Sequence, residues 1–202
     1  MPEPDDRHLV ETVRASRLAY QGGYLDLTVY EVELADGRRS ERAIVGHPGA
    51  VAIIALDADD QVLLVRQFRL AAGRILLEIP AGTLGHYRAS GSKEDPALAA
   101  ARELEEETGY RARTWEHVAA FWTAPGFATE LMHLYFATDL EPARDGRLGP
   151  DPDERLELVR MPWREAVGLA ERGEIADAKS FAGLTWLARR MEREAPPAHL
   201  SP

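Results

Sequence analysis

Three glutamates lie close enough together along the chain to hold a divalent cation between them. Glu103, Glu106 and Glu107 are spaced so that, in a helix, their side chains project from one face within about one turn. Carboxylates this close repel one another, and a cation such as Mg²⁺, which prefers oxygen ligands, would relieve that repulsion. Acidic runs on helices more often form a solvated face, so the spacing alone leaves both interpretations open.

The segment that positions these glutamates has the start and the end of a short helix. Asp95 is a good N-cap, Pro96 suits the first helical position, and Gly109 is a typical stop. Small and apolar residues recur at helical spacing, namely Ala97, Ala100, Ala101 and Leu104. This pattern predicts a helix face that packs closely against another element.

The residues around the glutamates resemble the Nudix box, the signature of the Nudix hydrolases. The core of that box, R-E-U-x-E-E-x-G-U with U apolar or aromatic, is matched by Arg102, Glu103, Leu104, Glu106, Glu107, Gly109 and Tyr110. Glu94 and Gly82 match the glutamate and the glycine that precede this core. The chain departs from the box in one respect, because eleven residues separate Gly82 from Glu94 instead of the shorter spacing that is usual. We interpret the additional residues, within 84–93, as a surface loop insertion.

The resemblance implies a metal-dependent cleavage of a nucleoside diphosphate that is linked to another group, with Mg²⁺ or Mn²⁺ as the cofactor. The implied ligands are Glu103, Glu106, Glu107 and the backbone carbonyl of Ala81. Glu106 is either a ligand or a catalytic group that orients the attacking water. Arg102 is expected to pair with Glu106 one turn away and to fix its orientation. Glu94 is expected to support the helix and the loop rather than to bind metal.

From residue 47 onward, the chain resembles the ADP-ribose pyrophosphatases within this family. A proline after the box marks that subgroup, and Pro125 lies sixteen residues beyond Gly109. The same resemblance implies that Arg69 and Glu78 line the substrate cleft. The alternative for the charged pair is that Arg69 is a charge at the rim of the molecule and Glu78 its partner.

The resemblance also implies where the general base lies. In this subgroup, the base that takes the proton of the attacking water comes from a loop before the last strand. The corresponding segment, residues 141–154, is polar and rich in glycine and proline. We choose Glu154 as the catalytic base, with Asp153 as the second candidate. The alternative is an acidic loop that is only solvated.

Composition excludes several other classes of protein. The chain of 202 residues has 45% hydrophobic residues, which suits one domain with an appendage. It has no cysteine, so disulfides and thiolate metal sites are excluded. A net charge of −10 argues against general binding to nucleic acid. No apolar run approaches the ~20 residues of a membrane span, and the acidic start is unlike a signal peptide. We therefore expect a cytoplasmic protein with neither membrane nor nucleic acid as a partner.

The strand pattern and the resemblance together predict an α/β (α+β) protein. The expected fold is the Nudix α/β/α sandwich with a mixed sheet, preceded by a small antiparallel sheet. Strands are expected at 9–17, 24–34, 42–45, 50–56, 61–69, 115–122, 131–138 and 155–161, and helices at 162–172 and 177–191. His133 is expected to be an ordinary strand residue rather than a ligand.

Two regions are expected on either side of the break at His47, Pro48 and Gly49. Residues 49–202 would form the Nudix hydrolase domain. Residues 1–48 would form a dimerisation sheet, because ADP-ribose pyrophosphatases use such a region to build an intertwined homodimer. The alternative is an extension without that role.

The predicted reaction is the hydrolysis of ADP-ribose to AMP and ribose 5-phosphate. An alternative substrate is another nucleotide sugar or a dinucleotide, such as GDP-mannose or NADH. A further alternative is a non-catalytic nucleotide sensor. The retained box glutamates and the absence of room for a basic DNA-binding module disfavour that alternative.

Overall fold

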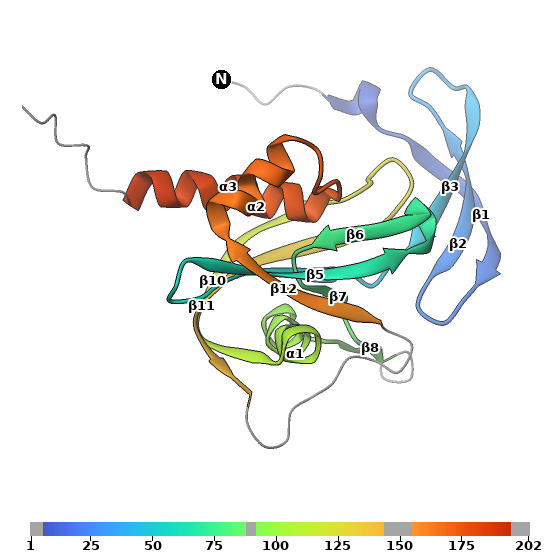
Figure 1. Cartoon of the computed structure of the whole chain (residues 1–202). Coiled ribbons are helices and arrows are strands. Elements are labelled where there is room, and N and C mark those ends of the chain that lie inside the picture. The colour runs from blue at the N-terminus through green and yellow to red at the C-terminus, as the bar shows by residue number, and fades with distance from the viewer. Residues whose placement is uncertain (1–5, 88–91, 144–154, 195–202) are drawn as a thin grey trace, which may run out of the picture.

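The computed structural model describes residues 6–87, 92–143 and 155–194. They form a seven-stranded sheet between helices, with a separate three-stranded sheet at its side (Figure 1). The predicted class is confirmed, since the sheet is mixed and the N-terminal sheet is antiparallel. No helix within these three ranges is long and apolar enough to cross a membrane.

The N-terminal sheet has the order β1-β2-β3, with β1 at Thr12–Gln21, β2 at Asp26–Glu33 and β3 at Arg39–Gly46. The turn between β2 and β3 uses Gly37, whose φ of 84° is favourable only for glycine, and its N–H donates to the carbonyl of Leu34. The prediction of a first strand at 9–17 was wrong at both ends. A 3₁₀ turn, Asp6–Leu9, comes first, and the strand continues to Gln21 because β2 pairs with it over that length.

The seven-stranded sheet has the order β10-β11-β4-β5-β12, with β6 paired to β5 and β7 paired to β4. Its strands are β4 (Ala50–Leu56), β5 (Gln61–Arg69), β6 (Arg74–Glu78), β7 (Ala81–Thr83), β10 (Tyr110–Trp122), β11 (Leu131–Pro142) and β12 (Leu156–Pro162). β11 and β4 are parallel, whereas the other pairs are antiparallel. β4 lies at the centre of this sheet, which is why it is a continuous apolar run with every residue buried.

Helices cover both faces of this sheet, with α1 (Pro96–Thr108) on one face and α2 (Trp163–Glu171) and α3 (Ala178–Glu194) on the other (Figure 1). Alternate residues of β4 serve the two layers. Ile54 packs in a cluster with Trp163 and Leu187 from the paired helices. Ile53 packs in a second cluster with Leu104 of α1. The predicted α/β/α sandwich is therefore confirmed.

Three predicted strands were too short. The strand expected at 42–45 is β3, which runs from Arg39 to Gly46 because β2 pairs with it over that length. β10 begins at Tyr110 rather than at 115, because Gly109 ends α1 and the chain enters the sheet at once. β11 continues past 138 to Pro142, which pairs with Tyr110. The inserted segment forms a small hairpin of β8 (His86–Tyr87) and β9 (Ser92–Lys93). It leads directly into α1.

Candidate active site

Helix α1 is anchored at both ends by the residues that the sequence predicts. The carboxylate of Asp95 accepts a hydrogen bond from the N–H of Ala97 at 2.8 Å, and Pro96 occupies the first turn. Gly109 adopts a left-handed conformation with φ of 72° and donates to the carbonyl of Glu105. Ala99, Ala100 and Leu104 are fully buried against the sheet, whereas Ala97 and Ala101, which the pattern also predicted on the packing face, are exposed. These contacts fix the direction in which the glutamates of α1 point.

The backbone of β7 lies against two of these glutamates. The N–H of Ala81 donates to Oε2 of Glu107 at 3.0 Å. Gly82 lies so close to Glu103 that a Cβ atom added to the glycine would be 1.9 Å from Cδ of that carboxylate. Glycine is therefore required at this position by the space that the Glu103 carboxylate occupies.

Arg102 gathers three carboxylates on the other side of the cluster. Its Nη1 contacts Oε1 of Glu103 at 2.7 Å and Oε2 of Glu106 at 2.6 Å. Its Nε donates to Oε1 of Glu94 at 3.1 Å. Burial alone would lower the pKa of Arg102, but these hydrogen bonds and negative charges raise it above its ordinary value. The expected pairing of Arg102 with Glu106 is confirmed.

Glu94 ties the inserted hairpin to α1. Its Oε2 accepts a hydrogen bond from the N–H of Gly85 at 2.7 Å, and it binds Arg102 through both oxygens. The hydrogen bond to Arg102 lowers the pKa of Glu94, and the Gly85 N–H acts in the same direction, although burial opposes both. These contacts are the supporting ones that the sequence predicts for Glu94.

The donor atoms of this cluster suit a hard divalent cation. Glu103 and Glu107 lie on neighbouring turns of α1, and their side chains are only 7% and 3% exposed. Two carboxylates buried this close to each other favour a positive charge between them. With Glu106 and the Ala81 backbone, they supply oxygen donors only, which is the set that Mg²⁺ prefers. In the described ranges, no three acidic or histidine side chains already converge on one point as metal ligands do. Glu103 and Glu106 instead form ion pairs with Arg102.

A second charged cluster surrounds Glu78 at the end of β6. Arg69 donates to its carboxylate from Nε at 3.0 Å and from Nη2 at 2.7 Å. Lys179 donates to Oε2 at 2.6 Å. Burial would raise the pKa of Glu78, which is 1% exposed, but the hydrogen bonds and charges of Arg69 and Lys179 hold it below its ordinary value. Arg69 and Glu78 are therefore partners, while the guanidinium of Arg69 remains partly exposed.

Lys179 and its neighbour Asp177 were missed by the sequence analysis. Lys179 lies in the first turn of α3 and Asp177 immediately precedes that helix, which the apolar pattern predicts only as a packing helix. The contact between Lys179 and Glu78 spans 101 residues of chain, so no local pattern reveals it. The one available signal was composition, because Lys93 and Lys179 are the only lysines among 24 lysines and arginines.

Pro125 lies exposed in the loop between β10 and β11. That loop is held by the end of β3, because the N–H of Val45 donates to the carbonyl of Phe127 at 2.7 Å. The N–H of Thr129 in turn donates to the carbonyl of Val45 at 2.9 Å. The structure thus joins the Pro125 loop to the N-terminal sheet. The candidate bases Asp153 and Glu154 lie outside the described residues.

His133 is half-buried in β11 and is not an isolated histidine. Its ring lies 5.8 Å from that of His117 on β10, between ring centroids. Burial lowers the pKa of His133, and the neighbouring His117 lowers it further. The prediction that His133 is a packed strand residue agrees with these contacts.

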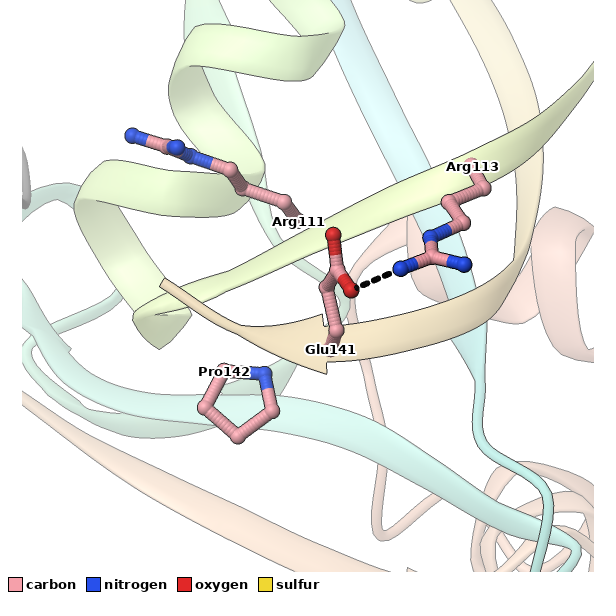
Figure 2. A pocket seen from close by; sticks show the side chains of 4 residues that line it. All are labelled: Arg111, Arg113, Glu141 and Pro142. Atoms are coloured by element: carbon pink, nitrogen blue, oxygen red, sulfur yellow. Dashed lines mark hydrogen bonds and ion pairs between the residues drawn. The ribbon is translucent and has the colours of Figure 1, made fainter. Parts of the chain in front are cut away.

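A cavity of about 310 Å³ lies at the paired ends of β10 and β11, lined by Arg111, Arg113, Glu141 and Pro142 (Figure 2). Arg113 donates to Glu141 at 2.6 Å. Arg111 points away from Glu141 and binds the buried Glu105 of α1 at 2.6 and 2.8 Å. Both arginines are thus engaged by carboxylates of the protein. The cavity does not include the glutamates of the predicted metal site.

The chain is similar in sequence and in fold to several known proteins. The chain is 39% identical to the ADP-ribose pyrophosphatase of Bacillus subtilis, over 90% of this chain and 94% of that protein. It is 30% identical to the GDP-mannose pyrophosphatase of Cronobacter sakazakii, over 90% and 96% of the two chains. A crystal structure of an ADP compounds hydrolase superposes with a TM-score of 0.77 at 22% identity, covering 92% of this chain and 96% of that one. That last likeness concerns the fold alone.

The helix with its three glutamates and the glycine that faces them lie inside the region that a family description recognises. The model of the NUDIX domain matches residues 46–184, which is more than half of the chain. The match begins at the end of β3 and continues into α3. The chain therefore belongs to the Nudix hydrolase family.

Proposed function

We propose that the protein hydrolyses the pyrophosphate of ADP-ribose to AMP and ribose 5-phosphate. The observation that carries this proposal is the 39% identity to an ADP-ribose pyrophosphatase over nearly the whole of both chains. The close approach of Gly82 to Glu103 and the hydrogen bond from Ala81 to Glu107 suit a metal-dependent reaction, because they hold two carboxylates beside one backbone segment.

Divalent ions, Mg²⁺ or Mn²⁺, would be held by the carboxylates of Glu103 and Glu107 and by the backbone carbonyl of Ala81. When bound, they neutralise the pyrophosphate oxygens and lower the pKa of a coordinated water. The hydrogen bond from the Ala81 N–H fixes the Glu107 carboxylate beside that backbone, so two of these donors are preorganised together. Glu106 is either a further ligand or the group that orients the water.

Arg102 prepares the other side of this site. It forms ion pairs with Glu103 and Glu106 and so offsets their negative charge. Arg102 also donates a hydrogen bond from Nε to the carboxylate of Glu94, which helps to fix its position.

Proton removal from the attacking water is assigned to Glu154, with Asp153 as the second candidate. Both assignments rest on the resemblance in sequence, since these residues lie outside the described ranges. Arg69 and Glu78 are proposed to line the substrate cleft, where the exposed edge of the Arg69 guanidinium can contact a phosphate or ribose oxygen. Pro125 is proposed to limit the cleft from the loop between β10 and β11.

Residues 1–48 are proposed to form a dimerisation region and residues 49–202 the catalytic domain. β1 is an edge strand whose ten residues are all exposed, including the large apolar side chains of Val13, Leu18 and Tyr20. A long exposed edge with apolar side chains favours pairing with another chain, and a second copy is the partner we propose. The lack of cysteine suits the cytoplasm as the place of action.

The test is a panel of substrates with Mg²⁺, in which the products are separated by chromatography. ADP-ribose, GDP-mannose, NADH and diadenosine polyphosphates are compared at equal concentration. Release of AMP and ribose 5-phosphate from ADP-ribose, well ahead of the others, is the expected result. Faster cleavage of GDP-mannose would replace the substrate assignment, and the 30% identity to a GDP-mannose pyrophosphatase makes this the second candidate. Nucleotide binding without any cleavage would instead indicate a sensor.

A further inference from the structure

Lys179 lies between two carboxylates at the start of α3. Its Nζ donates to Glu78 at 2.6 Å and to Oδ1 of Asp177 at 2.9 Å. Its side chain is only 11% exposed. The last helix of the described chain is thus joined by an ion pair to β6, which leads into the β7 backbone beside the glutamates.

The next residue of α3 makes a second contact with the same segment. Ser180 is fully buried, and its hydroxyl oxygen accepts a hydrogen bond from the N–H of Ile79 at 2.8 Å. Consecutive residues of the first turn of α3 therefore bind consecutive residues of the strand end. Ala81, which donates to Glu107, follows only two residues after Ile79.

Glu78 transmits the contact with Lys179 to Arg69. The two nitrogens of Arg69 that bind Glu78 form a bidentate pair, which fixes the plane of the guanidinium. The Arg69 side chain remains 42% exposed while it holds Glu78. Among the described residues, Arg69 and Lys179 are the two cations that bind the Glu78 carboxylate, so without Lys179 that carboxylate would keep Arg69 alone and the orientation of both groups would loosen.

A lysine suits this position better than the arginine that the chain uses nearly everywhere else. Lys93 and Lys179 are the only lysines among the 24 lysines and arginines. A compact ammonium with three donors fits between two carboxylates in a nearly closed space, whereas a planar guanidinium needs more room.

We propose that Lys179 is a positioning residue of the active site, which by binding Glu78 fixes the orientation of Arg69. The proposal rests on the proposed function, since it assigns Arg69 to the substrate. It adds the first turn of α3 to the parts of the chain on which the site depends.

The kinetic test compares Lys179→Met with Arg189→Met, using ADP-ribose and Mg²⁺. Arg189 lies on the same helix, is 75% exposed and pairs with Glu192 at the surface, so it is the matched control for loss of a positive charge. Loss of positioning should raise KM about tenfold and lower kcat less than about threefold in Lys179→Met. Equal KM values in the two variants would overturn the proposal. If Lys179→Met does not fold, Lys179→Gln replaces it with the same expectation.

A stability test is independent of catalysis. Glu78→Gln, Lys179→Met and the double variant are compared by calorimetry. Each single variant should lower Tm by roughly 5–15 °C, because one member of a buried pair is left without its partner. The double variant should lose clearly less than the sum of the two, since the residues act through each other. Additive losses would overturn the proposal. A wild-type protein that cleaves no substrate would contradict the proposed function. The comparison of the single and double variants would still show whether Lys179 acts through Glu78.

Discussion

At the scale of single residues, the candidate site depends on how closely the β7 backbone approaches α1. The place that a side chain on Gly82 would fill is taken by the carboxylate of Glu103. The N–H of the preceding Ala81 is bound to Glu107. A backbone segment that lies this near to two buried carboxylates leaves each of them little freedom, which is the condition for a preorganised ligand set.

Gly82→Ala should therefore displace the Glu103 carboxylate and weaken metal-dependent turnover. We expect kcat to fall by about 10- to 100-fold at fixed Mg²⁺, with partial recovery at higher Mg²⁺. The control is Gly23→Ala in the turn before β2, where an added Cβ meets no atom within 4 Å. Titration of activity against Mg²⁺ concentration measures the effect. An unchanged titration would show that Glu103 is not a ligand.

Glu107→Gln should reduce kcat by at least about 100-fold while the fold remains intact, because an amide is a poor substitute for a carboxylate ligand. Glu105→Gln is the matched control. Glu105 is equally buried on the same helix, but it binds Arg111 at the far edge of the sheet. That control should lose some thermal stability and keep its turnover. Near-normal activity of Glu107→Gln would remove Glu107 from the ligand set.

At the scale of elements, the end of β6 and the start of α3 form one unit through Glu78, Arg69 and Lys179. The contribution of this unit to the stability of the fold should depend on pH, and the pKa of Glu78 gives the direction. The pKa of Glu78 is depressed in the folded protein, whereas an unfolded glutamate titrates near 4.3. The carboxylate therefore stabilises the fold above about pH 4.3, and this stabilisation is lost as the pH falls through the depressed folded value.

The corresponding measurement is Tm against pH for the wild type and for Glu78→Gln. Near pH 7, the wild type should melt several degrees higher. The gap should narrow below about pH 4, because the wild-type carboxylate then becomes protonated. A gap that stays constant from pH 7 to pH 3 would contradict the depressed pKa of Glu78.

Elements were predictable from the sequence where local chemistry determines them. The bounds of β4 and β5 follow from apolar runs between turn residues, and those of α1 follow from Asp95 and Gly109. The length of β10 was underestimated because Arg111 and Arg113, at its start, are exposed, and their polar side chains are typical of a loop. The Lys179–Glu78 contact could not be predicted from the sequence, since only the packing of α3 on the sheet brings these two residues together.

At the scale of the whole molecule, the N-terminal sheet presents β1 as a free edge. Leu18→Arg should abolish the proposed dimer, because the added charge would have to be buried in the new interface. Light scattering at several concentrations measures the mass. Leu98→Arg, an equally exposed leucine on α1, is the control and should leave the mass unchanged. A Leu18→Arg variant that is still dimeric would move the interface away from β1.

The attachment of the Pro125 loop to Val45 has a practical consequence for anyone who handles this protein. Two backbone hydrogen bonds join this loop to Val45 of β3, which belongs to the N-terminal sheet. A shortened expression clone that starts at the first catalytic strand would keep every box glutamate and still release this loop. Because Pro125 is proposed to limit the cleft from this loop, such a clone is expected to discriminate less between nucleotide sugars than the full chain does.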